Sequence, residues 1–165
     1  MKAYTRPARL SPRICDGLVM LGTILAISAA LYMQFGRGLQ PCTMCIIQRY
    51  AFVIAGICAF VAWALPFRII RIAMVVTGIA GTLIGIGAAI RNLWVMAHPD
   101  VLCGRDPIEI FLNGLPMAQW LPEVFVASGL CSTPIPPLFG LSLPAWSLIG
   151  LLVLAVLLGL SLRKR

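Results

Sequence analysis

The chain has 165 residues, of which 61% are hydrophobic and 11% are charged, and its formal net charge at pH 7 is +8. Soluble domains carry about 25% charged residues, so this composition excludes an ordinary soluble protein and indicates a membrane protein. The basic residues gather at the ends of apolar stretches, a distribution typical of membrane topology and not of a nucleic-acid-binding surface.

Four apolar stretches can each cross a bilayer, which takes about 20 residues. They cover residues 17–35, 46–65, 72–90 and 145–162. Each must be helical, because lipid offers no partner for backbone amides. The sequence therefore predicts an all-α polytopic membrane protein, a four-transmembrane-helix bundle in one domain over residues 1–165. The first stretch also has features of a signal peptide, but its length favours an uncleaved helix.

The positions of the basic residues predict the orientation of the bundle. With four spans, three basic segments fall on the same side of the membrane: Lys2, Arg6, Arg9 and Arg13; Arg68 and Arg71; and Arg163, Lys164 and Arg165. Because Lys and Arg favour the cytoplasmic side, both termini are predicted to be cytoplasmic. The loops 36–45 and 91–144 then lie on the outer, periplasmic side.

The two outer loops differ in length and character. The first is short, and Pro41 suits the first turn of the helix that follows, so the motif Pro41-Cys42-Thr43-Met44-Cys45 begins the second span. The second loop is long and rich in proline. Within it, residues 120–126 are apolar but too short to span, which predicts a short horizontal helix in the headgroup region.

The predicted topology separates the six cysteines. Cys15 lies at the cytoplasmic end of the first span and Cys58 lies within the second, where a small buried or reduced thiol is expected. The other four, Cys42, Cys45, Cys103 and Cys131, face the oxidising side, where disulfides persist. Two cysteine pairs therefore share one compartment, an arrangement typical of a thiol–disulfide relay.

Cys42 and Cys45 form a CxxC pair at a helix N-terminus, a setting that favours the reactive thiolate. One alternative is a structural staple, but a disulfide across two residues closes almost no loop and gains little stability. Another is half of a zinc site, although zinc usually takes a second CxxC, and Cys103 with Cys131 is not one. We therefore favour redox chemistry and expect no metal.

Cys103 and Cys131 lie 28 positions apart in the long loop. A structural disulfide closing such a loop would contribute about 3–4 kcal/mol on the chain-entropy model, so this alternative stays open. Against it, Cys103 lies in the segment Leu-Cys-Gly-Arg, a flexible and electropositive setting that exposes its sulfur to an incoming thiolate.

Three polar side chains are candidates for binding an electron acceptor. Arg49 lies four residues after Cys45, on the same helix face and about one turn deeper. At that depth an arginine costs at least about 2.5 kcal/mol unless a thiolate at Cys45, a bound electron-rich acceptor or snorkelling offsets it. Gln48 could add a hydrogen bond to the same acceptor. His98, the single histidine, begins the outer loop, where a lone histidine is more often incidental.

These residues resemble the DsbB family of bacterial inner-membrane disulfide-forming proteins over nearly the whole chain. The resemblance is carried by the motif at 41–45 with Arg49, by Arg91 with His98, by WLPEVFVASGLC at 120–131, and by FGLSLPAW at 139–146. The segment 120–131 is the most specific of these.

The resemblance implies an enzyme that uses a membrane quinone to reoxidise a periplasmic thioredoxin-like dithiol oxidase, DsbA. On the matching positions, Cys103 would take the mixed disulfide with the partner, and Cys131 would be its loop mate. Cys42 would exchange with the loop cysteines, and Cys45 would lie against the quinone ring. Arg49 would support that quinone, and His98 would help to line its site. The acceptor is expected to be ubiquinone, with menaquinone as the alternative.

Three rivals to this function remain open at the level of sequence. An enzyme running in the opposite direction needs a cysteine pair facing the cytoplasm, where only Cys15 lies. A non-enzymatic membrane protein would hold two structural disulfides or one four-cysteine zinc site. A paralogue of the same family would serve one dedicated substrate.

Overall fold

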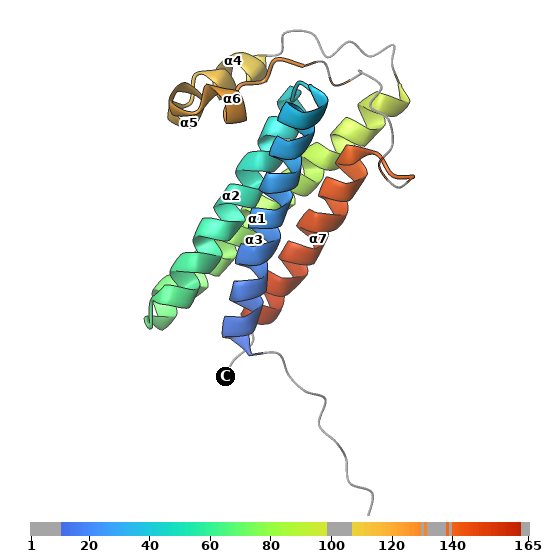
Figure 1. Cartoon of the computed structure of the whole chain (residues 1–165). Helices are drawn as coiled ribbons and strands as arrows, with labels where there is room; N and C mark the ends of the chain where they lie inside the picture. The colour runs from blue at the N-terminus through green and yellow to red at the C-terminus, as the bar shows by residue number, and fades with distance from the viewer. Residues whose placement is uncertain (1–10, 99–106, 130, 132–137, 139, 163–165) are drawn as a thin grey trace, which may run out of the picture.

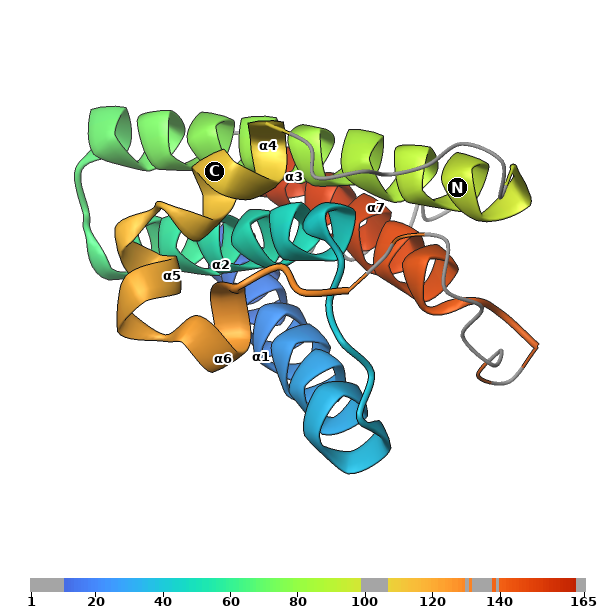
Figure 2. The same ribbon diagram turned by 90° about the horizontal axis from the view of Figure 1, so that it is seen from above.

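The computed structural model describes residues 11–98, 107–129, 131, 138 and 140–162, which form seven helices. Four are long: α1 (Pro12–Arg37), α2 (Thr43–Ala64), α3 (Arg68–Ala97) and α7 (Leu143–Ser161). All four are long and apolar enough to cross a membrane, which confirms the predicted all-α four-helix membrane bundle. Figures 1 and 2 show these helices packed side by side.

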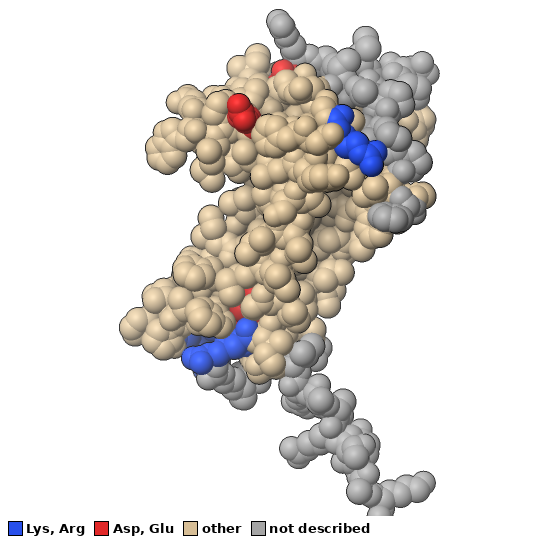
Figure 3. Space-filling view, in the orientation of Figure 1, with Lys and Arg blue, Asp and Glu red and all other residues tan. Residues whose placement is uncertain are grey.

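The two ends of the bundle carry different residues. We call the end where α2 begins, with Cys42, the cysteine end, and the end where α1 begins and α7 terminates the arginine end. Between them, the face drawn in Figure 3 shows no charged side chain. Within the long helices, large apolar side chains such as Ile24, Ile84 and Val156 are more than 60% exposed, as lipid-facing residues should be.

Small residues let α2 and α3 approach closely. A Cβ added at Gly85 would lie 2.5 Å from the Cβ of Ala51, and one at Gly81 would lie 3.0 Å from Ile54. The spacing Gly81-xxx-Gly85 therefore acts in packing, as small residues do at membrane helix interfaces. Cys15 and Cys58 are both buried in the bundle, as the sequence predicts.

The helix α3 continues to Ala97, past the span end expected at Ile90. Its 30 residues extend about 45 Å at 1.5 Å per residue, more than the hydrocarbon thickness of about 30 Å. Part of the segment assigned to the long loop is therefore a helical extension, which brings Asn92 and Val95 to the level of the cysteines.

Three short helices, α4 (Pro107–Asn113), α5 (Pro116–Trp120) and α6 (Pro122–Phe125), cover the cysteine end beside α2 (Figures 1 and 2). The segment 120–126, expected as one short helix, holds the end of α5 and the whole of α6. The break falls at Leu121, which has φ −131° and ψ 66°, because Pro122 has no N–H to continue the first helix. Leu112 and Ala127 pack on Ile46 of α2.

Candidate redox site

The CxxC pair lies at the first turn of α2. Cys42 is the N-cap residue, with extended backbone, and its carbonyl accepts a hydrogen bond from the amide of Ile46 at 3.0 Å. The Sγ atoms of Cys42 and Cys45 are 3.0 Å apart, so a disulfide can close with little movement.

The loop cysteine Cys131 lies against this pair. It is 5% exposed and packs with Cys42 and with Val95 of α3. Hydrogen bonding to Cys131 and to Cys45, together with burial, raises the pKa of the Cys42 thiol far above its usual range. Three of the four predicted redox cysteines are therefore brought together. Cys103 lies outside the described residues.

Backbone contacts hold the segment before Cys131 in place. The amides of Ser128 and Gly129 donate to the carbonyl of Pro41 at 3.1 and 3.0 Å, and the Ser128 hydroxyl donates to Gln40 Oε1 at 2.7 Å. Gly129 pairs with Cys42 as in a parallel strand. A Cβ at Gly129 would overlap the Gln40 carbonyl, so only glycine fits this approach.

Asn92 is a site residue that the sequence analysis missed. Its amide Nδ2 donates to the sulfurs of Cys45 at 3.5 Å and Cys42 at 3.7 Å, and the residue is 1% exposed. A polar side chain near the end of an apolar helix is a functional candidate by default, because burying it costs free energy. The sequence contains this signal, because the polar Asn92 directly follows Arg91.

Arg49 is 7% exposed, and its described hydrogen bonds go to oxygen and not to sulfur. Its Nη1 donates to Gln34 Oε1 of α1 at 2.8 Å and to the carbonyl of Val124 in α6 at 2.6 Å. Gln34 in turn donates to the carbonyl of Glu123 at 2.5 Å. Arg49 therefore ties α6 and α1 to α2, and these carbonyl contacts offset its burial.

The other two predicted acceptor-binding residues lie in different environments. Gln48 is 4% exposed, and its Nε2 has no hydrogen-bond partner among the described residues. His98 is exposed and ends α3, where its Nδ1 lies 3.0 Å from the carbonyl of Trp94. The His98 ring also stacks on Trp94, with centroids 4.7 Å apart, and the guanidinium of Arg91 lies 5.0 Å from the centroid of the same Trp94 ring.

The family model described as "Disulfide bond formation protein DsbB" matches residues 12–161. The chain belongs to this family. Similar proteins named Disulfide bond formation protein B come from Cupriavidus necator, 40% identical over 90% of this chain and 91% of that protein, and from Cupriavidus metallidurans, 41% identical over the same shares. Disulfide bond formation protein B 1 of Pseudomonas syringae pv. syringae is 43% identical over 85% of this chain and 84% of its own.

Membership of the DsbB family makes the chain a disulfide-forming oxidoreductase, and the four long apolar helices make it a multi-pass membrane protein. The cysteine geometry suits that chemistry. Thiol–disulfide exchange requires a thiolate to reach a sulfur of a disulfide, and Cys131 is already packed against Cys42. Exchange between the loop and the helix pair therefore needs only a small movement.

Proposed function

We propose that this protein is a quinone-coupled thiol oxidase of the bacterial inner membrane that reoxidises a periplasmic DsbA-like dithiol protein. Electrons pass from the partner to Cys103 and Cys131, then to Cys42 and Cys45, and leave to a membrane quinone. The observation that carries the proposal is the burial of Cys131 against the CxxC pair at the start of α2.

Two thiol–disulfide exchanges carry the electrons, the first from the partner to the loop pair and the second from the loop pair to the CxxC pair. A partner thiolate attacks Cys103 of a Cys103–Cys131 disulfide, and the partner's second thiol then closes its own disulfide, leaving both loop cysteines reduced. The Cys131 thiolate next attacks the Cys42 sulfur of a Cys42–Cys45 disulfide and releases Cys45 as thiolate. Cys103 then displaces Cys42 and restores the loop disulfide. Asn92 Nδ2, 3.5 Å from the Cys45 sulfur, stabilises the released thiolate.

The residues near Cys45 fit a quinone, whose two ring carbonyls accept hydrogen bonds. The Gln48 Nε2 is buried and has no hydrogen-bond partner among the described residues, so it can donate a hydrogen bond to a bound acceptor. Arg49 follows it along the helix and brings positive charge. His98 is exposed and stacks on Trp94 at the same end of the bundle, where its ring could line the quinone site. The quinone, when bound, supplies a sink for two electrons and two protons.

The orientation is part of the proposal. Arg13, Arg68 and Arg71 lie at the arginine end. The other basic residues of the termini are adjacent to this end in sequence: Lys2, Arg6 and Arg9 precede α1, and Arg163, Lys164 and Arg165 come after α7. Since Lys and Arg favour the cytoplasmic side, the arginine end faces the cytoplasm and the cysteine end faces the periplasm. Ubiquinone is the proposed acceptor, with menaquinone as the alternative.

The test is loss of quinone absorbance when the purified protein in detergent receives ubiquinone and an excess of reduced DsbA-like partner. Quinone loss should follow partner oxidation in step. Cys45→Ala should abolish it, because the electron exit is removed. Cys58→Ala is the matched control, since Cys58 is a buried thiol of the same helix, among the α2–α3 packing residues.

Quinone reduction by Cys45→Ala at the normal rate would contradict the assignment of the exit. If the protein with intact cysteines reduces neither ubiquinone nor menaquinone, the result would favour structural disulfides or a zinc site. Metal analysis would distinguish these two alternatives. Quinone reduction with only one of several thioredoxin-like partners would indicate a paralogue dedicated to one substrate.

A further inference from the structure

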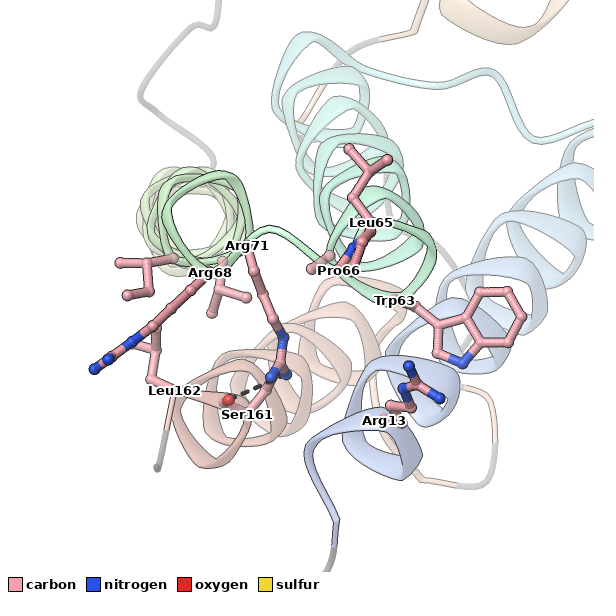
Figure 4. Close-up of a pocket in the computed structure, with 11 residues that line it drawn as sticks. Arg13, Trp63, Leu65, Pro66, Arg68, Arg71, Ser161 and Leu162 are labelled. Atoms are coloured by element: carbon pink, nitrogen blue, oxygen red, sulfur yellow. Dashed lines mark hydrogen bonds between the residues drawn. The ribbon is translucent and has the colours of Figure 1, made fainter. Parts of the chain in front are cut away.

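A cavity of about 470 Å³ opens at the arginine end of the bundle (Figure 4), the end opposite the cysteines (Figure 1). Residues from α1, α2, α3 and α7 line it, together with the turn between α2 and α3. Arg13, Arg68 and Arg71 are three of the lining residues, and Trp63 and Leu162 are among the apolar ones. The redox mechanism uses none of them.

One of the three arginines is fixed by a buried carboxylate. Arg71 Nη2 lies 3.0 Å from Asp16 Oδ2 and donates to the Ser161 hydroxyl at 2.8 Å, while that hydroxyl donates to Asp16 Oδ1. Asp16 is fully buried, so the Arg71 guanidinium is held at the cavity between α1, α3 and α7. Its charge is matched by Asp16.

The other two arginines are left without a carboxylate. Within the described part of the chain, the Arg71–Asp16 contact is the one ion pair. Three arginines and one aspartate therefore leave a net charge of +2 around the cavity. In Figure 4 Arg13 lies beside Trp63 on the α1 side, and Arg68 lies beside Leu162 on the opposite side of Arg71. Topology alone requires positive charge at this end but does not require a cavity.

The apolar part of the cavity lining indicates that the ligand comes from the membrane. Trp63 is 48% exposed, and tryptophan favours the boundary between hydrocarbon and headgroups. Leu162 and Trp63 flank the arginines, so a bound anion would carry apolar chains alongside it. Basic pockets between transmembrane helices on the cytoplasmic side suit phosphate-bearing lipid headgroups.

We propose that this cavity binds the phosphodiester headgroup of an anionic phospholipid, attracted by the unmatched positive charge of Arg13 and Arg68 on either side of the fixed Arg71. The binding chemistry depends on the fold alone. Only the statement that the lipid comes from the cytoplasmic leaflet rests on the proposed orientation. Binding can therefore be measured without partner or quinone, and failure of the redox proposal would leave it intact.

The experiment measures lipid binding to the delipidated full-length protein in detergent, by native mass spectrometry and by the shift in thermal unfolding. The probes are phosphatidylglycerol, phosphatidylcholine and inorganic phosphate. The variants are Arg13→Gln, Arg68→Gln and the double variant. Each arginine should contribute about 5-fold to phosphatidylglycerol affinity, so the double variant should lose about 25-fold. Arg37→Gln, an exposed arginine at the cysteine end, is the matched control and should lose nothing.

Three outcomes would overturn the proposal. Phosphatidylcholine binding as tightly as phosphatidylglycerol would mean that the arginines do not select an anionic headgroup. Inorganic phosphate protecting the protein as well as the lipid does would assign the cavity to a free anion. An equal loss in Arg37→Gln would indicate general surface charge. If the double variant fails to fold, the two single variants decide the question by the same criterion.

Discussion

At the scale of single residues, Asn92 is the side chain that most directly sets the chemistry of the CxxC pair. Its amide donates to both sulfurs from within α3. A hydrogen bond to a charged group is worth about 1.5–3 kcal/mol, and a thiolate accepts it better than a disulfide sulfur does. We therefore expect Asn92 to stabilise the reduced pair and to raise its reduction potential.

We expect Asn92→Ala to lower the reduction potential of the Cys42–Cys45 pair by about 30 mV, the two-electron equivalent of about 1.4 kcal/mol. The measurement is a redox titration against dithiol buffers in a protein whose loop cysteines are replaced by serine. Thr82→Ala is the control, because Thr82 is a buried polar residue of the same helix whose hydroxyl donates only to the carbonyl of Ile79. An unchanged potential in Asn92→Ala, or an equal shift in Thr82→Ala, would contradict this role.

At the scale of elements, the loop helices α4–α6 are docked on α2 by contacts that differ in kind. Arg49 of α2 binds the carbonyl of Val124, and the rings of Tyr50 and Phe125 lie 4.8 Å apart. Within the loop itself, Asn113 of α4 exchanges two hydrogen bonds with the backbone of Ala127. These contacts end at Gly129, where the chain passes over Gln40 and turns Cys131 toward Cys42. Docking therefore supplies the proximity that the proposed exchange between the two pairs needs.

Gly129→Ala should slow exchange between the loop pair and the CxxC pair without slowing exchange between the partner and the loop pair. The added Cβ overlaps the Gln40 carbonyl, and backbone cannot yield there without shifting the adjacent Pro41 and Cys42. We expect transfer from the loop pair to the CxxC pair to slow by at least about 10-fold, because the sulfurs lose their prepared geometry. Attack of the partner on Cys103 should keep its rate. Rapid-quench alkylation after mixing with reduced partner measures both steps.

The control for this variant is Gly87→Ala in α3, where an added Cβ meets open space within 4 Å. Equal slowing of both steps in Gly129→Ala would indicate general destabilisation, and unchanged transfer would mean that the docked segment does not position Cys131.

The sequence predicts these elements unevenly, for physical reasons. Apolar length is a local property, so the four long helices follow from it directly. The partners of Arg49 do not, because Val124 lies 75 positions away and contributes a backbone carbonyl that any residue could supply. Asn92 was missed because a helix pattern does not reveal which face meets the first turn of its neighbour. The predicted roles of Cys103 and His98 stay predictions.

At the scale of the whole molecule, the bundle is closed at opposite ends by different chemistry. The cysteine end is held by loop helices docked on α2, and the arginine end by one buried polar cluster joining α1, α3 and α7. In the sequence Arg71 is recognisable as a topology signal only, because Asp16 and Ser161 lie 55 and 90 positions from it. The same arginine is therefore a topology signal in the sequence and a packing residue in the fold.

The cluster gives a last prediction, on stability. Removing the carboxylate in Asp16→Ala leaves the Arg71 guanidinium without its counter-charge in a site where its side chain is only 22% exposed. Breaking a buried pair costs about 3–5 kcal/mol, and partial access of Arg71 to solvent reduces this to about 2 kcal/mol. Thermal unfolding in detergent should show a lower midpoint for Asp16→Ala. Adding Arg71→Met should restore part of the loss, because no unpaired charge then remains. Additive losses in the double variant would mean that the two side chains do not interact. Arg37→Gln should leave the midpoint unchanged, because Arg37 is exposed and has no described carboxylate partner.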